Sequence, residues 1–282
     1  SIDKPLTLVG NSTIIEVLGS YGVLISSDDV DISGFVIMMS DQALYGIFGI
    51  SGLSGISIHD NTITSYNSEA RGNYGIYFQK NLVDDSTEAE DIGISGNTIY
   101  NLSSSGIYIG SAGTGIEIAG NNIYSINDSG FGSTISLEMA DSFSISSNTL
   151  ASSDIGIELI SSSGSVSGNS FMYDIDPILV QTSDSDISFD MAIYYALVSG
   201  DSSDVDYKRI YRSLDAAIAE YSYEDGDSIF LYEDGVETQL SVDCAGVWEG
   251  ESTLDSCGNC DTNPSNDCTS LSLNFDPGSS LI

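Results

Sequence analysis

Four cysteines lie close together near the C-terminus of the 282-residue chain, and their spacing limits the chemistry that they can do. They are Cys244, Cys257, Cys260 and Cys268. A Cys-x-x-Cys pair can hold zinc or carry out redox chemistry, but the two other cysteines are irregularly placed for a zinc site. No βαβ pattern, the usual setting of a redox pair, is visible around them. We therefore expect two intrachain disulfides, in one of the three pairings that four cysteines allow.

Oxygen-bearing side chains alternate in the segment that follows this cysteine pair. They are Asp261, Asn263, Ser265 and Asp267, each two residues after the last. Such a spacing lets a short loop wrap around a hard cation, and carboxylate and amide oxygens suit Ca²⁺. The sequence predicts a Ca²⁺ site here, with a solvated polar turn as the alternative.

Basic residues that could take part in catalysis are few, because the chain has 6 basic residues against 42 acidic ones. Arg71 and Lys80 are the candidates for removing a proton from a substrate, and both lie in or beside a long insertion, residues 64–90. Solenoid proteins usually place their sites on such loops. Asp28 and Asp29 form a carboxylate pair of the kind that glycosidases use, although adjacent acids also arise by chance in so acidic a chain.

A recurring phrase predicts the elements that would position these side chains. Ile92-Gly-Ile-Ser-Gly-Asn-Thr-Ile99 is one copy, and the asparagines of the five copies are Asn61, Asn97, Asn121, Asn148 and Asn169. Their steps of 36, 24, 27 and 21 residues match one turn of a solenoid. Alternate isoleucines place one face of each strand inward. Gly96 and Asn97 tolerate left-handed backbone angles, so the chain can turn a corner there.

A second phrase, such as Tyr74-Gly-Ile-Tyr-Phe78, lies between these turns. The two phrases predict about three short strands per turn, with turns stacked about 4.8 Å apart and asparagines bonded to one another along the axis. Strong helix formers are scarce, which argues against a helical solenoid. His59, the one histidine, stands where other turns carry serine, so we expect it to be structural. We expect these side chains to face inward: Ile92, Ile94, Ile99, Ile107, Ile109, Ile116, Ile118 and Ile123.

The pattern Ile-x-Ile-x-Gly-Asn-x-Ile … Gly-Ile-x-Ile, over residues 1–200, resembles the right-handed parallel β-helix superfamily, in its group of pectin-lyase-like repeats. The resemblance implies an all-β, right-handed parallel β-helix of about eight turns. The superfamily contains lyases, hydrolases, phage tailspikes, adhesins and surface proteins, so it does not fix an activity. The Gly-His-Gly and Arg-Ile-Lys motifs of polygalacturonase-like members are absent. We therefore assign no catalytic residue and expect a non-enzymatic protein, with a polysaccharide lyase or glycoside hydrolase as the alternative.

The net charge of −36 excludes several classes of partner. With 41% hydrophobic residues and a clear strand period, the chain is expected to fold and to carry its charge outside. Such a surface repels nucleic acid, anionic lipid and polyuronates, and it suits Ca²⁺, salt-rich water or a cationic partner. No apolar run is long enough to span a membrane.

Several features indicate secretion to the cell surface or the extracellular space. An even number of cysteines in a chain rich in Ser, Thr and Asn favours an oxidising compartment. The start at Ser1, without an initiator Met or a signal peptide, suggests a processed chain or a fragment. Asn11, Asn101 and Asn127 stand in glycosylation sequons.

After residue 200 the repeat stops. Residues 201–243 predict a helix with Ser213 as N-cap, followed by a strand at 228–232. In the β-helix proteins that this chain resembles, such a helix-and-strand module opens the domain and covers the N-terminal end of the coil. Here the module follows the coil, so the first turn at Ser1 is left without it.

Three arrangements of this module are possible. It could cover the C-terminal end of its own coil, begin a second β-helix that is lost by processing, or dock on the first turn of the next copy by strand addition. The last would produce a head-to-tail filament, and it is the arrangement that we predict. Glycan binding by an adhesin is a further alternative. The residues predicted to be buried by assembly are Leu214, Ile218, Ile229 and Leu231.

The tail, residues 244–282, resembles short extracellular modules that look like thrombospondin type 3 calcium repeats. The resemblance rests on Asp243-Cys-Ala-Gly-Val-Trp-Glu-Gly250 and on Asp255-Ser-Cys-Gly-Asn-Cys260. It implies a Ca²⁺-binding, disulfide-linked spacer of a surface protein. Leu271, Leu273 and Phe275 alternate like a final strand.

Overall fold

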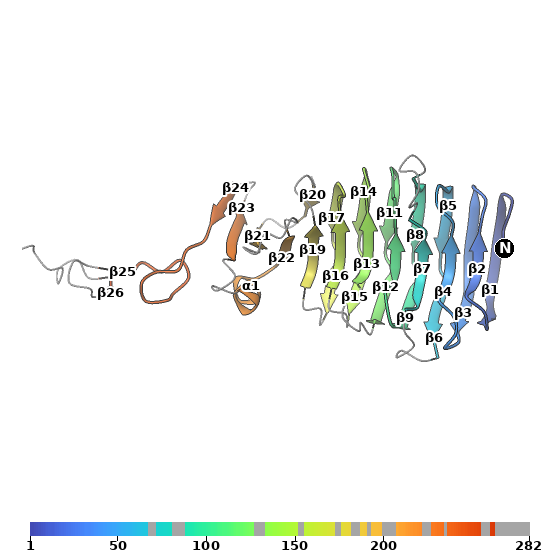
Figure 1. Cartoon of the computed structure of the whole chain (residues 1–282), viewed down its shortest axis with the longest axis horizontal. Helices are drawn as coiled ribbons and strands as arrows, with labels where there is room; N and C mark the ends of the chain where they lie inside the picture. Colours follow the sequence, from blue (N-terminus) through green and yellow to red (C-terminus); the bar gives the residue numbers. More distant parts are fainter. Residues whose placement is uncertain are drawn as a thin grey trace, which may run out of the picture.

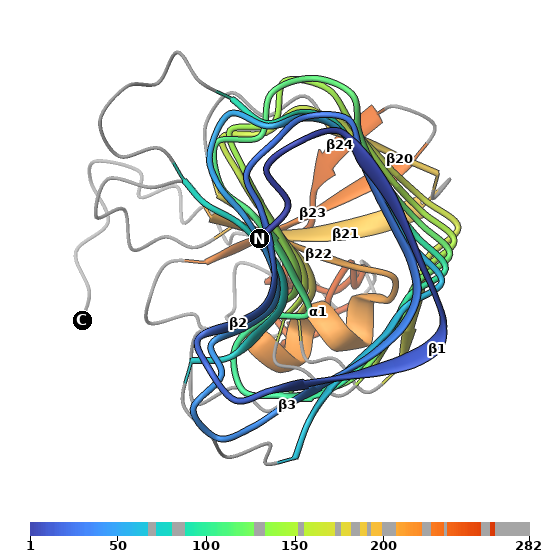
Figure 2. The same cartoon turned by 90° about the vertical axis from the view of Figure 1, so that its right-hand side faces the viewer.

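The computed structural model describes most of the chain as an elongated β-solenoid with very little helix (Figure 1). The described residues are 1–66, 72–80, 88–126, 133–151, 155–172, 176–181, 187–190, 193–198, 207–221, 227–233, 236–254 and 260–262. Seen from the end, the successive turns superimpose on one another, so the same cross-section is repeated along the axis (Figure 2). The parallel solenoid that the repeat predicted is therefore confirmed.

Two long sheets make up the coil, and both consist of parallel strands from successive turns. In the coil, sheet A consists of β2 (Tyr21–Ile25), β4 (Tyr45–Gly49), β7 (Tyr74–Phe78), β10 (Ile107–Ile109), β13 (Ser133–Glu138), β16 (Ile155–Ile160) and β19 (Asp176–Gln181). Among the described residues sheet B consists of β1 (Leu6–Val17), β3 (Val30–Met39), β5 (Ser54–His59), β6 (Thr62–Ser65), β8 (Glu90–Ser95), β9 (Thr98–Leu102), β11 (Ile116–Ala119), β12 (Asn122–Ile126), β14 (Phe143–Ser146), β15 (Thr149–Ala151), β17 (Gly164–Ser167), β18 (Ser170–Met172) and β20 (Ile187–Phe189).

The parallel coil is shorter than the sequence suggested. From β2 to β19 sheet A advances by six steps among the described residues, not by about eight. After β19 the next neighbour, β22 (Tyr207–Tyr211), pairs in the antiparallel direction. It is followed by β21 (Ile193–Val198), β23 (Ser228–Glu233) and β24 (Val236–Gln239), all antiparallel. The change of direction ends the stacking, because an antiparallel strand cannot continue a coil that always winds the same way.

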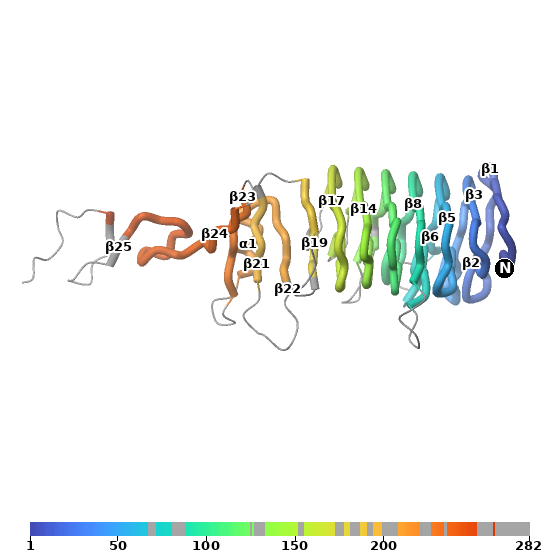
Figure 3. Tube along the Cα trace, turned by 90° about the horizontal axis from the view of Figure 1, so that it is seen from above, coloured from blue at the N-terminus to red at the C-terminus, as the bar shows by residue number. Residues whose placement is uncertain are grey.

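The described residues from β21 onward form a small end module. Helix α1 (Leu214–Glu220) begins at Ser213, whose hydroxyl accepts a hydrogen bond from the Ala216 amide, as the capping pattern predicted. The helix lies beside β21 and β22. Beyond it, β25 (Thr253–Leu254) pairs with β26 (Cys260–Asp261). Seen from above, with the long axis horizontal, this module extends the row of stacked turns (Figure 3).

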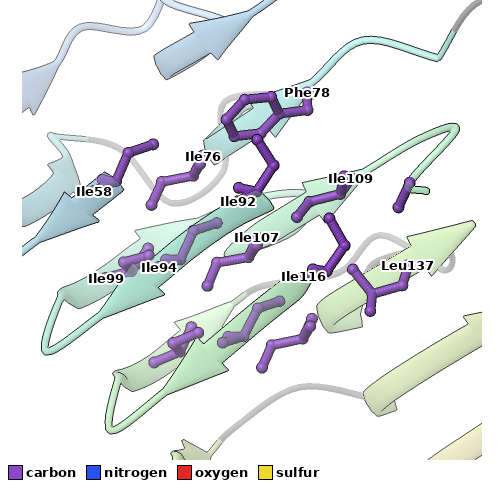
Figure 4. Packing of buried hydrophobic residues seen from close by; sticks show 14 of the residues in the cluster. Ile58, Ile76, Phe78, Ile92, Ile94, Ile99, Ile107, Ile109, Ile116 and Leu137 are labelled. Atoms are coloured by element: carbon purple, nitrogen blue, oxygen red, sulfur yellow. The ribbon is translucent and has the colours of Figure 1, made fainter. Parts of the chain in front are cut away.

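The core is a column of isoleucines inside the coil (Figure 4). All eight isoleucines that the alternation placed inward are at most 2% exposed. Each lies against its counterpart in the next turn, as Ile94 does against Ile58 and Ile118. Burying a side chain of this size contributes roughly 1.5–3 kcal/mol, so the column supplies the main apolar contribution to folding.

The five repeat asparagines form a buried ladder at one corner. The Oδ1 atom of Asn61 accepts the Phe35 amide, and from Asn97 on each Oδ1 accepts the backbone N–H of the preceding rung, from Asn61–Asn97 at 3.0 Å to Asn148–Asn169 at 3.0 Å. Each Nδ2 donates to the next Oδ1, for example 3.0 Å from Asn121 to Asn148, and to a carbonyl of the turn before. The ladder thus satisfies polar groups that would otherwise be buried without partners.

The left-handed backbone at this corner belongs to the residue before each asparagine, so the prediction for Asn97 itself was wrong. Gly96 and Gly120 have φ of 63°, while Asp60 and Ser147 have 55° and 56°. The asparagine is required for its amide, and the residue before it makes the turn. A non-glycine residue at such a φ costs roughly 1–2 kcal/mol.

Replacing the central rung tests the ladder. Asn121→Ala would leave the backbone and side-chain amides of Asn97 without their shared acceptor. We expect a loss of roughly 2–4 kcal/mol in the free energy of unfolding, since each buried unsatisfied group costs about 1–3 kcal/mol. Urea denaturation followed by circular dichroism measures it.

Ser147→Gly is the matched control at the same corner. It relieves the left-handed strain without touching the ladder, so it should raise stability by about 1 kcal/mol. A loss for Asn121→Ala below about 0.5 kcal/mol would contradict the role of the ladder.

Candidate functional site

The outer surface of sheet A carries a continuous group of aromatic side chains. We call this group the aromatic face; it consists of Tyr21, Tyr45, Phe48, Tyr74, Tyr77 and Tyr108. The parallel register places Tyr77 between Phe48 and Tyr108 on the neighbouring strands. The Phe48 and Tyr77 rings stack at 5.7 Å and 8°, and those of Tyr77 and Tyr108 at 4.8 Å and 12°.

A glycine in each second phrase allows these rings to stand outside. A Cβ atom on Gly75 would lie 2.6 Å from the Gly106 carbonyl oxygen and 2.7 Å from the Ile99 side chain. This position therefore points into the core and has no room for a side chain. With Ile76 buried next to it, Tyr74 and Tyr77 remain half-buried on the outer surface.

A polar cluster borders the aromatic face. Lys80 forms an ion pair with Glu138, two strands away in sheet A, and the Tyr108 hydroxyl donates to Glu138 Oε1 at 2.8 Å. Gly110 lies between them, and a Cβ there would be 2.6 Å from the Cβ of Lys80. On the next turn, Glu158 accepts a hydrogen bond from the Ser136 hydroxyl at 2.9 Å. The cluster thus joins residues 58 positions apart in the sequence.

The electrostatics of this region keep its phenols neutral. Burial raises the pKa of Tyr77 to about 12, with smaller contributions from Tyr45, Tyr74 and Glu138. Burial and the hydrogen bond to Glu138 also raise the pKa of Tyr108. Both phenols are hydrogen-bonding groups and not bases at ordinary pH. Lys80, the candidate base, is an ammonium in an ion pair, and an ammonium has no lone pair with which to accept a proton.

The other catalytic candidates do not join this cluster. Asp28 accepts the Ser54 amide at 2.9 Å, and Asp29 stands at a left-handed turn with φ of 55°, so both shape a corner of the coil. Arg71 lies outside the described residues. The arrangement of the aromatic face offers flat apolar rings, hydroxyl groups and one bordering ion pair, which suits binding of a flat, partly apolar, polyhydroxylated ligand.

Sequence reasoning found only part of this face. Tyr74 and Tyr77 belong to the insertion of residues 64–90, which the sequence indicates as a candidate site. For Tyr45, Phe48 and Tyr108 the sequence predicts only strands. The signal was present in the second phrase. Aligning Tyr45-Gly-Ile-Phe48, Tyr74-Gly-Ile-Tyr77 and Ser105-Gly-Ile-Tyr108 places an aromatic residue two positions after the glycine in all three copies.

The N-terminal end of the coil is incompletely covered. The inward-facing Leu6 is 37% exposed and Leu8, Ile15 and Val23 are partly exposed, whereas their counterparts one turn on are at most 1% exposed. Outward-facing apolar residues are exposed on the same turn, with Val9 at 60% and Leu18 at 78%. Within the described residues, nothing lies on the outer side of β1.

The end module packs on the last turn of its own coil. Beside the β19–β22 pairing, Arg212 Nη2 donates to the carbonyl oxygen of Asn169, the last rung, at 2.6 Å and stands over the Phe171 ring at 5.3 Å. Ile229 is fully buried, and Leu214, Ile218 and Leu231 pack around it with Tyr211 and Ala217. In Figure 2, α1 projects within the outline of the coil. In the described residues the end module thus pairs with the last turn of its own chain, and the four residues predicted for assembly contact their own chain; head-to-tail assembly stays a prediction.

The described residues include only a few of the residues on which the tail predictions depend. Among the described residues there is no free cysteine, but Cys257 and Cys268 lie outside the described residues. The predicted Ca²⁺ ligands Asn263, Ser265 and Asp267 lie outside them as well. Cys260 and Asp261 are described by their backbone alone, so disulfides and Ca²⁺ stay predictions. In the described ranges no group of three acidic, His or Cys side chains could hold a metal.

The sequons differ in accessibility. Asn11 is exposed at a bulge in β1, Asn101 is half-buried, and Asn127 lies outside the described residues. None of the helices that the structure describes is long and apolar enough to cross a membrane.

His59 bridges two carboxylates on the outside of sheet B. Its Nδ1 lies 2.9 Å from Asp60 Oδ2 and its Nε2 lies 3.1 Å from Asp31 Oδ1. The hydrogen bond to Asp60, together with the charges of Asp31 and Asp60, raises the pKa of His59 above its ordinary value of 6.5, and burial offsets part of this increase. The ring thus links two turns of the coil, in keeping with a structural role.

This geometry predicts a pH dependence of stability. Because the folded-state pKa is raised, the stabilisation is fully present below pH 6.5 and is lost as pH rises through the folded-state pKa. We expect the Tm of the native chain to fall by about 1–3 °C above pH 6.5, given that the ring is partly solvated. His59→Gln should lack this fall in calorimetry. An identical pH profile for both proteins would show that the bridge contributes nothing.

The chain was compared with protein-family models, curated proteins and solved structures. No family model, no curated protein and no solved structure matches this chain.

Proposed function

We propose that this chain is an extracellular surface protein that binds neutral glycans through the aromatic face. The observation that carries the proposal is the stack formed by Phe48, Tyr77 and Tyr108 along the axis of the coil. Because these rings stack on one another, they turn their edges outward, where the edges can contact the apolar C–H groups of a sugar and the neighbouring hydroxyls can bond to its hydroxyls. An extended saccharide would then lie along the solenoid axis.

Charge favours a neutral ligand. The net charge of −36 repels polyuronates and sulfated glycans, and the polar cluster beside the face presents two carboxylates, Glu138 and Glu158, against the single ammonium of Lys80. Buried or bonded acceptors of this kind suit sugar hydroxyls, which donate hydrogen bonds. The proposal includes no turnover, because Lys80 is held in an ion pair and the two phenols are neutral.

Glycan binding by the full chain tests the proposal. We expect Tyr45→Ala with Tyr77→Ala to weaken binding of neutral β-linked glucan or xylan oligosaccharides by at least about tenfold, since two aromatic contacts of roughly 0.5–1.5 kcal/mol each are lost. Isothermal titration calorimetry measures the affinity. Polygalacturonate should not bind.

The matched control is a second stacked pair, Tyr100 and Tyr124, on the outside of sheet B at 5.1 Å and 2°. Tyr100→Ala with Tyr124→Ala should leave the affinity unchanged. Equal losses in both double variants, or no binding of any neutral glycan, would refute the proposal. Release of sugar fragments that stops in Lys80→Met would instead favour the lyase or hydrolase alternative.

Head-to-tail assembly into a filament or surface layer is the second candidate function, and the uncovered first turn favours it. The apolar side chains of β1 and the unpaired outer edge of that strand would be covered by the opposite end of another copy. Since Leu214, Ile218, Ile229 and Leu231 pack within their own chain, the contact would use the outer edge of the end module, where all four residues of β24 are exposed.

Assembly should strengthen with salt, because joining copies of charge −36 costs repulsion that ions screen. We expect light scattering and electron microscopy to show longer assemblies at higher salt and protein concentration. Val9→Lys, at the exposed first turn, should abolish them. Tyr66→Lys, at a side chain that is 59% exposed against 60% for Val9 and that follows β6 in the interior of sheet B, is the control. Monomers under all conditions would exclude this function for the chain.

A further inference from the structure

A cavity of about 580 Å³ lies in the end module, away from the aromatic face. It opens between the end of α1, strand β23 and the loop of residues 241–250. Its volume falls within the range of small-ligand sites. Six of the residues that line it carry the argument: Tyr221, Asp227, Ile229, Leu240, Asp243 and Trp248.

The floor of the cavity is apolar and one wall is aromatic. Ile229 is fully buried and Leu240 is 6% exposed. The rings of Tyr221 and Trp248 meet edge to face, 4.8 Å apart and at 90°. Trp248 remains partly exposed, so its ring is available to a ligand.

A fixed carboxylate stands beside this wall. Asp243 Oδ1 accepts the amides of Ala245 and Val247 at 2.9 and 2.8 Å, and its Oδ2 accepts the Ser252 amide at 3.1 Å. These bonds, the one from Val247 foremost, lower the pKa of Asp243. A Cβ on Gly250 would lie 2.0 Å from Oδ2, so glycine there makes room for the carboxylate. Asp227 adds a second carboxylate to the lining.

We propose that this cavity binds an alkylammonium group, with the methylene chain on Ile229 and Leu240 and the ammonium between Trp248 and the two carboxylates. Aromatic rings attract such cations through their negative faces, and the carboxylates complement the charge. An anionic ligand would be repelled. A purely apolar ligand would remove water from the carboxylates without replacing it.

Two sources could supply this group, a free amine or a lysine side chain of a second copy. Lys4 is the one basic residue among residues 1–70, and it is exposed. Strand β1, which begins two residues after Lys4, and the elements beside the cavity, α1 and β23, lie on opposite sides of the parallel coil along its axis (Figures 1 and 3). Copies joined end to end would bring Lys4 of one chain toward the cavity of the next. The lysine source rests on the assembly proposed above; the cavity itself does not.

Trp248 provides a direct measurement, because it is the chain's only tryptophan. We expect hexylammonium to change its fluorescence saturably in the full-length chain, while hexanol and hexanoate do not. Asp227→Asn should weaken the response by about tenfold, a factor typical of one partly desolvated charge contact. Trp248→Phe, followed by calorimetry, should weaken binding as well. Tyr45→Ala with Tyr77→Ala, on the aromatic face, should leave it unchanged.

An N-acetylated peptide of residues 1–8 distinguishes the sources. If the peptide changes the Trp248 fluorescence and competes with hexylammonium, while its Lys4→Glu version does not, a second copy supplies the cation. If only hexylammonium binds, the cavity serves a free amine, and assembly can still occur by another contact. Equal responses to hexylammonium and hexanol, or no saturable response to either probe, would overturn the proposal.

Discussion

The structure depends on hydrogen bonding between turns. Parallel strands of successive turns supply the backbone partners of sheets A and B, and the asparagine ladder does the same for the side chains at the corner. Because each turn is satisfied only by its neighbours, stability grows along the axis and the two ends are the weak points. The two ends of the coil differ in the described residues. At the last turn, Arg212 and β22 pack on the coil, whereas the apolar side chains of the first turn remain partly exposed.

Stacking in register also determines the outer surface. A residue type repeated in the same position of each turn becomes a column, as Phe48, Tyr77 and Tyr108 do on sheet A and Tyr100 and Tyr124 do on sheet B. A small preference in the repeat is thus converted into an extended, uniform surface. In the column of Phe48, Tyr77 and Tyr108, the next two positions are Ser136 and Glu158. The aromatic face therefore ends at Tyr108, and the polar cluster begins in the same column.

The charge of the chain gives its two candidate sites opposite preferences. On sheet A, the half-buried rings and neutral phenols present little charge, and Lys80 is neutralised by Glu138. In the end module, Asp227 and Asp243 line the same cavity as Trp248. A surface of −36 therefore provides one region that suits neutral ligands and one that suits cations.

The sequence by itself determined the solenoid, the inward isoleucines and the ladder, because these depend on a period and on alternation, which are local properties of the chain. Only the tertiary structure decided that Tyr45, Phe48, Tyr77 and Tyr108 form one surface, that Lys80 meets Glu138 58 residues away, and that the end module packs on its own coil. These depend on the lengths of the turns between repeats, which vary from 21 to 36 residues, and on strand direction after β19. Periodicity fixes which face a side chain takes, but the neighbours on that face follow from the register between turns.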